Sequence, residues 1–145
     1  MARDPLQVLL RVRGIALDAA RRALADRLRE ETEAAERCAG IATTIAREAA
    51  VQTGQPVERR TVEFYAVWLG RNLAAQREAA AAARACAAAT AEARASLSEA
   101  RSAARALEAA LAQAQDASRE AAARLEQRAV DEAAAECRRP EPWSG

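Results

Sequence analysis

The sequence predicts an all-α fold: a long antiparallel two-helix coiled coil, that is, a helical hairpin whose second helix overhangs the first at its C-terminal end. Three observations predict this fold. Residues of high helix propensity dominate the composition, one strong interruption lies near residue 54, and apolar residues recur with heptad spacing on both sides of it. Two helices joined by a short turn and matched along apolar seams form an antiparallel pair.

The composition favours helices and disfavours a compact core. Alanine occupies 44 of the 145 positions, and the aromatic residues are limited to Phe64, Tyr65, Trp68 and Trp143. A compact core is filled mainly by large aliphatic and aromatic side chains, which are scarce here. Heavy use of Ala, Glu, Arg and Leu is instead typical of coiled coils.

The charges of the chain are balanced. The 22 basic residues, all of them arginine, face 21 acidic residues, and the net charge is +1. So small a charge gives little long-range attraction to polyanions, so we expect no nucleic-acid partner and weak attraction to anionic lipid. The apolar run near Leu9 is interrupted by Arg11 and Arg13, so no signal peptide is predicted and the expected location is cytoplasmic.

Prolines and glycines mark the predicted helix ends. Asp4 is suited to an N-cap and Pro5 to the first helical position. Gly54 is suited to a helix C-cap, and Pro56 to the start of a new helix. The predicted elements are a helix over 5–52, a turn over 53–57 and a helix over 58–137, within a single domain over 1–138 that is followed by a flexible, proline-rich tail over 139–145.

The first predicted helix carries an apolar seam. Leu10, Leu17, Leu24, Cys38 and Ile45 recur every seven residues, with Glu31 as the exception. A second row four positions later is predicted to contain Leu28, Ala35, Ala42 and Ala49. Two such rows form the seam of a coiled coil.

The second predicted helix carries two matching rows. The first contains Leu69, Ala83, Leu97, Ala104, Leu111 and Leu125, with the polar residues Gln76, Thr90 and Ser118 at the positions between. The second contains Ala79, Cys86, Ala93, Ala100, Leu107, Ala114 and Ala121. Polar residues in a seam lower stability and often set the register of the two helices.

The two helices differ in length, which predicts an overhang. A turn centred near Gly54 pairs residues whose numbers sum to about 110, so that Leu6 lies beside Ala104. Residues beyond about Arg105 then have no partner within the chain. This overhang carries the apolar residues Leu107, Leu111, Leu125 and Val130. An apolar stripe without an internal partner should self-associate or bind another protein.

The residues exclude most catalytic chemistry. No histidine is present, so nucleophilic catalysis of the Ser-His or Cys-His type is excluded, and the isolated glycines form no phosphate-binding loop. Cys38, Cys86 and Cys137 are widely separated and cannot complete a metal site. We therefore expect no catalytic residue, no cofactor, no metal ion and no small-molecule substrate.

The aromatic cluster Phe64-Tyr65-Ala66-Val67-Trp68-Leu69 follows the predicted turn. Its members cannot all face one partner helix, because neighbours on a helix lie three and four residues apart. The cluster either closes the hairpin tip against Ile41 and Ile45 or forms a docking patch for a partner, and both roles are compatible.

Three segments resemble the FliJ family, the small stalk proteins of the bacterial flagellar type III export apparatus. They are the helix start Asp4–Leu10, the patch Tyr65-x-x-Trp68-Leu69 and the stretch Arg124–Ala133, which contains Glu126-Gln127-x-x-x-Asp131-Glu132. The resemblance covers the whole chain in length and layout. Its most specific parts are the aromatic patch and the Glu126–Glu132 stretch.

The resemblance implies a non-enzymatic stalk that couples two parts of the export apparatus. Family members insert into the hexameric ring of the export ATPase, contact the cytoplasmic domain of the membrane-embedded export gate, and are credited with escorting export chaperones. The implied location is the cytoplasm, peripheral to the export apparatus at the inner membrane.

The resemblance also implies two sets of partner-binding residues. The gate set lies near the hairpin tip and contains Ile41, Ile45, Trp68, Leu69, Asn72 and Ala75. Asn72 stands where the family usually has Leu, and the tyrosines usual on the first helix are missing. The ATPase set lies on the C-terminal helix and contains Leu107, Leu111, Leu125, Gln127, Asp131 and Glu132.

Three alternatives stay open at this point. The first is the equivalent stalk of a virulence-type secretion system, the second a self-associating structural coiled coil. The third is an amphipathic helix protein of lipid surfaces, against which the alanine-rich apolar face and the small net charge argue. Genomic neighbours, sedimentation and liposome flotation, respectively, separate these alternatives from the flagellar stalk.

Overall fold

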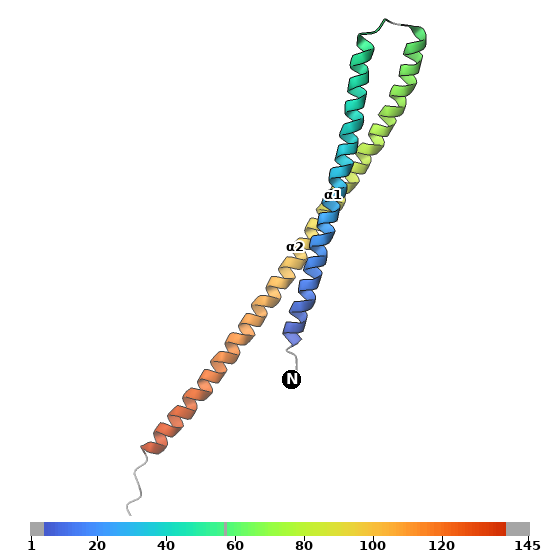
Figure 1. The fold of residues 1–145 in the computed structure, drawn as a ribbon. Helices are drawn as coiled ribbons and strands as arrows, with labels where there is room; N and C mark the ends of the chain where they lie inside the picture. Colours follow the sequence, from blue (N-terminus) through green and yellow to red (C-terminus); the bar gives the residue numbers. More distant parts are fainter. Residues whose placement is uncertain (1–4, 57, 139–145) are drawn as a thin grey trace, which may run out of the picture. The chain divides into compact units, whose positions relative to one another are not determined.

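The structure, a computed structural model, describes residues 5–56 and 58–138. It contains two helices, α1 (Pro5–Thr53) and α2 (Arg59–Cys137), and no strand among these residues (Figure 1). The two helices pack against each other as a helical hairpin, so the predicted all-α fold class is confirmed. The predicted tail over 139–145 lies outside the described residues.

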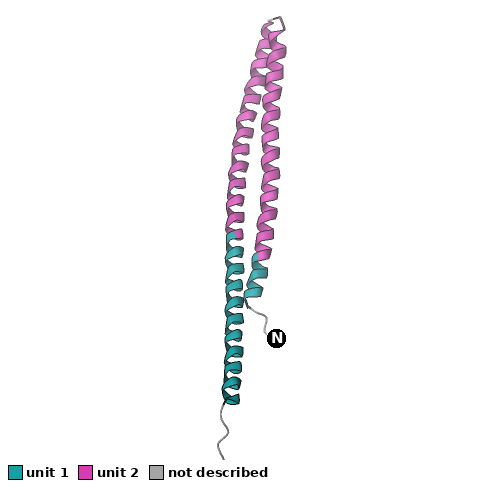
Figure 2. Cartoon of the chain, turned by 90° about the vertical axis from the view of Figure 1, so that its left-hand side faces the viewer, with its two compact units in different colours: residues 1–13, 102–145 teal, residues 14–101 magenta. Residues whose placement is uncertain are grey.

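The chain divides into two compact units (Figure 2). One contains residues 14–101, and the other contains residues 1–13 together with 102–145. The single domain predicted over 1–138 stays a prediction. In the unit of residues 14–101, α1 and the beginning of α2 run side by side in opposite directions and are joined at the hairpin tip (Figures 1 and 2).

Local hydrogen bonds terminate α1 at the hairpin tip. The Thr53 hydroxyl donates to the carbonyl oxygen of Ala50 at 2.8 Å, and the Gly54 N–H donates to the carbonyl oxygen of Val51 at 3.2 Å. These bonds satisfy carbonyl groups that would otherwise lack a partner in the last helical turn. The helix therefore stops where glycine and proline predicted an interruption.

The inner face of α1 confirms one predicted row and corrects the other. Every seventh residue is half-buried, namely Leu10, Leu17, Leu24, Glu31, Cys38, Ile45 and Gln52. The second row lies three positions later, not four, and contains Ala20, the buried Ala34, Ile41 and Glu48. The predicted row of Leu28, Ala35, Ala42 and Ala49 was wrong, since all except Ala42 are exposed. Alanine lies on every face of α1, so alanine spacing alone cannot distinguish the two rows.

Both predicted rows of α2 are confirmed as far as Leu111. The buried or half-buried residues are Leu69, Gln76, Ala83, Thr90, Leu97, Ala104 and Leu111 in one row, and Asn72, Ala79, Cys86, Ala93, Ala100 and Leu107 in the other. The predicted members beyond Leu111, including Ala114, Ala121 and Leu125, are exposed. The apolar pattern of α2 thus continues beyond the last residue that packs against α1.

The unit of residues 14–101 has a thin interior. Its buried residues among those described are Ala34, Thr90 and Leu97, with exposed fractions of 1%, 0% and 7%. Small side chains let two helices approach closely, but each contact removes little apolar surface from water, at about 25 cal/mol per Å². Stability here must therefore be sensitive to single polar or oversized side chains in the seam.

The unit of residues 1–13 and 102–145 contains a stretch of α2 that nothing covers. Its described part pairs the first turns of α1 with α2 from Ser102 onward (Figure 2). Ala104 is buried and Leu107 and Leu111 are half-buried, whereas every residue from Ala112 to Ala133 is exposed. The predicted end of the cover at about Arg105 was therefore wrong by about two helical turns.

A glycine inside the hairpin is expected to limit its stability. A Cβ atom at Gly40 would meet no other atom within 4 Å, so this position needs no glycine for close packing. Gly40→Ala is expected to raise the free energy of unfolding by about 1 kcal/mol, because alanine loses less backbone entropy in a helix. Chemical denaturation measures this gain. Gly54→Ala, in the turn, is the control and should change the free energy of unfolding less. A Gly40→Ala protein with unchanged or lower stability would contradict the expectation.

Candidate partner-binding surfaces

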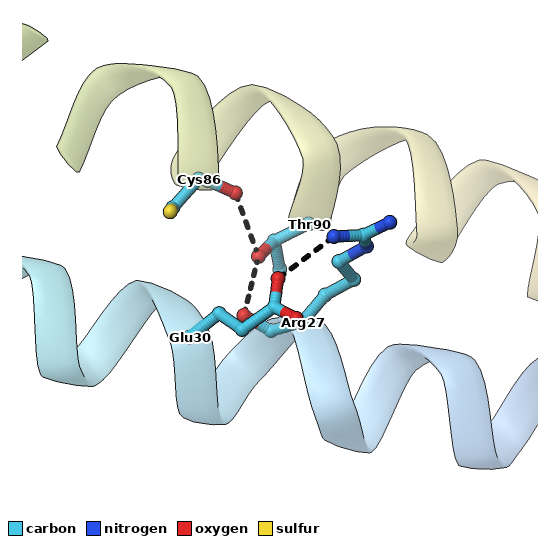
Figure 3. A network of polar contacts seen from close by, with 4 residues as sticks. All are labelled: Arg27, Glu30, Cys86 and Thr90. Carbon is cyan, nitrogen blue, oxygen red and sulfur yellow. Dashed lines mark hydrogen bonds and ion pairs between the residues drawn. The ribbon is translucent and has the colours of Figure 1, made fainter. Parts of the chain in front are cut away.

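One side chain links the two helices through the backbone. The buried Thr90 hydroxyl lies 3.0 Å from the carbonyl oxygen of Cys86 on its own helix and 3.3 Å from that of Arg27 on α1 (Figure 3). A hydroxyl has one proton, so it donates to one of these oxygens or is shared between them. Thr90 therefore contacts the α1 backbone directly, and this contact defines which residues of the two helices lie side by side.

The Thr90 contact corrects the predicted register. Residue numbers 27 and 90 sum to 117, whereas the predicted pairs sum to about 110. This register extends the cover of α2 by seven residues, and it agrees with half-buried Leu107 and Leu111. The two leucines belong to the seam, so they are covered in part rather than free as predicted.

An exposed ion pair lies beside this contact. The Arg27 guanidinium donates to the Glu30 carboxylate at 2.7 Å within α1 (Figure 3). This hydrogen bond and the negative charge of Glu30 raise the pKa of Arg27 above its ordinary value. An exposed pair of this kind contributes little to stability.

Enlarging Thr90 is expected to destabilise the hairpin. Residue Thr90 has an exposed fraction of 0%, so the larger side chain of Thr90→Leu has no room and should lower the free energy of unfolding by about 1–3 kcal/mol. Thr90→Val keeps the volume and removes only the hydroxyl, at a cost of about 1 kcal/mol. Urea denaturation compares the two variants, and a stabilised Thr90→Leu would show that the helices are not in close contact here.

The gate residues implied by the resemblance line the inner side of the hairpin near its tip. Ile41, Ile45, Trp68, Leu69, Asn72 and Ala75 are all half-buried. The Asn72 amide donates to the carbonyl oxygen of Trp68 at 2.9 Å, so this side chain is held by its own helix. A partner reaches only part of each of these residues while the hairpin is closed.

The aromatic cluster is divided between two faces of α2. Tyr65 and Trp68 are half-buried, and their rings stack with centroids 5.8 Å apart and planes inclined by 19°. Phe64 and Val67 instead have exposed fractions of 68% and 57%. The stacked pair is thus directed to the seam side, and Phe64 and Val67 form an exposed face, here called the tip face.

The tip face lies within the aromatic cluster predicted to plug the hairpin tip or to form a docking patch, although Phe64 and Val67 were not among the predicted gate residues. Arg60, Phe64, Val67 and Arg71 follow one another at spacings of four, three and four, which places them on one side of α2. All four are exposed. An exposed phenylalanine beside exposed arginines has the composition that is enriched in protein interfaces. Phe64 and Val67 lie outside the seam rows of α2, and this signal in the sequence could have identified the face.

The predicted ATPase residues beyond Leu111 lie on an uncovered helix, here called the C-terminal segment of α2 (residues 112–137). Leu125 and Val130 have exposed fractions of 64% and 62%, and Gln127, Asp131 and Glu132 are also exposed. The Gln127 amide donates to the Asp131 carboxylate at 2.9 Å. Pairs along this helix, Arg119 with Asp116 and Arg124 with Glu120, connect neighbouring turns. The segment presents an apolar stripe within a charged surface.

A further apolar face was missed in the sequence. Val8, Leu9, Val12 and Ile15 have exposed fractions between 46% and 62%, and they are here called the outer stripe of α1. Val8 and Val12 each lie two positions from a half-buried leucine, Leu6 or Leu10, which is about 200° around the helix. The beginning of α1 is therefore apolar on two opposite sides, and only one of them packs against α2.

Comparison with known families identifies the chain. A family model described as Flagellar FliJ protein matches residues 1–139. The chain belongs to the FliJ family. The match spans both helices and the turn, so the resemblance seen in the sequence is confirmed. No curated protein and no solved structure is significantly similar to the chain.

Membership of the FliJ family assigns the chain to flagellar protein export. The family consists of structural components of this export system. This member folds as the helical hairpin described above. None of the helices in the described residues is long and apolar enough to cross a membrane.

Proposed function

We propose that this FliJ-family protein is a non-enzymatic stalk that couples the export ATPase to the export gate. In this proposal the C-terminal segment of α2 enters the hexameric ATPase ring, and the hairpin tip contacts the cytoplasmic domain of the gate. The protein then acts in the cytoplasm, peripheral to the export apparatus at the inner membrane. Export chaperones are further proposed partners.

The uncovered C-terminal segment of α2 carries the proposal. Its seam rows continue past Leu111, and every residue from Ala112 to Ala133 is exposed; residues 112–137 together span about 39 Å of helix at 1.5 Å per residue. A hydrophobic row on an exposed helix favours binding to a groove or ring of another protein. The modest size of this stripe favours contacts that form and break with successive subunits, because strong binding would arrest a working ring.

The tip face supports the second contact. Phe64 and Val67 are exposed while the residues of the gate set are half-buried. The tip face and the accessible edges of Trp68 and Leu69 then form the proposed gate-binding surface. This surface and the C-terminal segment lie on different parts of α2, so one chain can bind both partners.

Reconstitution with the cognate export ATPase tests the proposal. The chain should co-purify with the ATPase and increase its rate of ATP hydrolysis, because a stalk that fits the ring stabilises the assembled hexamer. The assay includes the ATPase alone and the chain alone. No association together with unchanged ATP turnover would contradict the ATPase half of the proposal.

Substitution of the tip face is expected to weaken gate binding selectively. Phe64→Ser combined with Val67→Ser should weaken binding to the gate's cytoplasmic domain by about tenfold or more, because exposed aromatic anchors contribute strongly to interfaces. Leu73→Ser is the matched control, since Leu73 is an exposed aliphatic residue with a fraction of 40% on another side of α2. Titration calorimetry measures both affinities. Equal weakening by the control, or none by the double variant, would contradict this assignment.

A further inference from the structure

The hairpin of residues 14–101 has two halves that differ in packing. The inner half contains residues 14–34 of α1 and 83–101 of α2, and the tip half contains residues 35–53 and 59–82. In the observed register, residues whose numbers sum to 117 lie side by side, so each half is a matched pair of segments. The inner half contains three buried residues, whereas every described residue of the tip half is half-buried or exposed. The two helices are therefore in closest contact in the inner half.

A hydrogen bond between the two helices also lies in the inner half. The Thr90 hydroxyl lies 3.3 Å from the carbonyl oxygen of Arg27 (Figure 3). In the tip half, the side-chain hydrogen bonds and ion pairs of the described residues stay within one helix, as the bond from Asn72 to Trp68 does. Apart from the turn, no such bond among the described residues connects the two segments of the tip half.

The seam of the tip half combines polar with apolar residues. In the observed register, the four pairs nearest the turn each contain one of both kinds: Ile41 with Gln76, Ile45 with Asn72, Glu48 with Leu69, and Gln52 with Tyr65. The inner half contains one such pair, Glu31 with Cys86. A polar side chain that loses water to an apolar neighbour gains no partner in exchange. The closed tip half is therefore stabilised weakly across its seam.

The helix α1 has a weak point where the two halves meet. A Cβ atom at Gly40 would meet no other atom within 4 Å, and glycine is the weakest helix former after proline. The hydroxyls of Thr43 and Thr44 each donate to the carbonyl oxygen four residues back, at 2.9 and 3.0 Å. Such bonds compete with the helical amides and favour bending. We expect α1 to bend between residues 40 and 44 when the tip half separates.

We propose that the tip half opens while the inner half stays paired, and that this open form binds the export gate. Opening moves α1 beyond Gly40 away from α2 and uncovers Ile45, Trp68 and Leu69, which are half-buried in the closed hairpin. A partner then gains one aromatic and two aliphatic side chains as anchors. The opening concerns the isolated chain, and its link to the gate rests on the proposed function.

Amide hydrogen exchange of the isolated full chain tests the opening. Residues 41–53 and 61–75 should exchange about tenfold or more faster than residues 17–31 and 86–100, because a helix separated from its partner frays. They should exchange more slowly than residues 112–137, which lack cover altogether. Equal protection of the two halves would overturn the proposal, since the hairpin would then open as one unit.

Seam substitutions should close the tip half. Glu48→Leu with Gln76→Leu changes helix propensity little and gives two residues an apolar neighbour across the seam, so exchange in the tip half should slow by about tenfold. Exchange in the inner half should be unchanged. Glu36→Leu with Arg77→Leu, at exposed positions of the same two segments, is the matched control. Slowing by the control, or none by the seam variant, would overturn the proposal. Circular dichroism verifies folding, and Gln76→Leu alone replaces the double variant if helicity is lost.

Binding to the gate tests the link. Where a minor open form is the one that binds, the apparent affinity falls by the factor by which that form is depleted. Titration calorimetry with the gate's cytoplasmic domain should therefore show about tenfold weaker binding by the seam variant and unchanged binding by the control. Glu48 and Gln76 lie outside the gate set, so the proposed contact residues stay intact. Equal affinity of the seam variant and the unaltered chain would overturn binding by the open form. Failure of the unaltered chain to bind the gate would instead overturn the proposed function and, with it, the link.

Discussion

Glu31→Leu is expected to raise the free energy of unfolding by about 1–3 kcal/mol. Glu31 occupies a seam position of α1 between Leu24 and Cys38, and its Oε2 atom is buried without a hydrogen-bond partner. A buried polar atom that loses its water and gains no partner costs free energy in the folded state. Leucine removes this cost and adds apolar surface to a thin seam.

Chemical denaturation of matched variants measures the gain. Glu33→Leu changes the same residue type on the exposed side of α1, where the carboxylate has an exposed fraction of 67%, and should leave stability nearly unchanged. Glu31→Gln retains a polar side chain in the seam and should recover little of the gain. A Glu31→Leu protein that is no more stable than the wild type would show that the carboxylate is satisfied in solution.

Removal of the C-terminal segment of α2 is expected to abolish the effect on the export ATPase. A chain truncated after Leu111 keeps every buried and half-buried residue of the seam up to that position, so the hairpin should remain folded. It loses the whole uncovered apolar row, and binding to the ATPase should weaken by about a hundredfold or more. Pull-down and ATP hydrolysis assays measure the loss.

Circular dichroism is the control for the truncated chain. Its signal per residue should stay close to that of the full chain, because the segment is helical but contributes nothing to the packed seam. A truncated chain that still activates the ATPase would place the contact on the hairpin itself. A truncated chain that unfolds would show that the segment contributes to stability in a way the packing does not explain.

The fold class could be predicted from sequence because its signals are independent of one another. Gly54 and Pro56 mark the interruption, and Leu69, Leu97 and Leu111 are large enough among alanines to define the seam of α2. The second row of α1 could not be predicted in the same way. Alanine is buried at position 34 and exposed at position 35, and nothing in its chemistry distinguishes the two.

The register error has a physical cause. The residue numbers of the observed contact, Arg27 with Thr90, sum to 117, and those of the predicted pairs sum to about 110, a difference of one heptad. A shift of one heptad leaves the same rows facing each other, so periodicity alone cannot detect it. The specific feature is the Thr90 hydroxyl beside the Arg27 carbonyl oxygen, a contact with the backbone that no side-chain pattern encodes. The end of the cover at Leu111 rather than Arg105 follows from this shift.

The predicted partner-binding residues stay a prediction, and their two sets differ in exposure. Leu125, Gln127, Asp131 and Glu132 are exposed as a partner contact requires, whereas the gate set is half-buried. The aromatic cluster that contains the tip face was predicted as a tip plug or a docking patch, whereas the outer stripe of α1 was not predicted because it does not belong to the seam. Both faces lie on sides of a helix outside the seam. They are found by assigning every apolar residue of the helix, and not only those with heptad spacing, to a side.

Amide hydrogen exchange of the chain, alone and with the cognate export ATPase, tests the stalk proposal most directly. In the dilute isolated chain, residues 112–137 should exchange faster than residues 14–101, because their helical hydrogen bonds lack tertiary cover. With the ATPase, protection should increase over residues 112–137 and remain unchanged at the hairpin tip. Protection at the tip alone, or no change anywhere, would contradict insertion of the C-terminal segment into the ring.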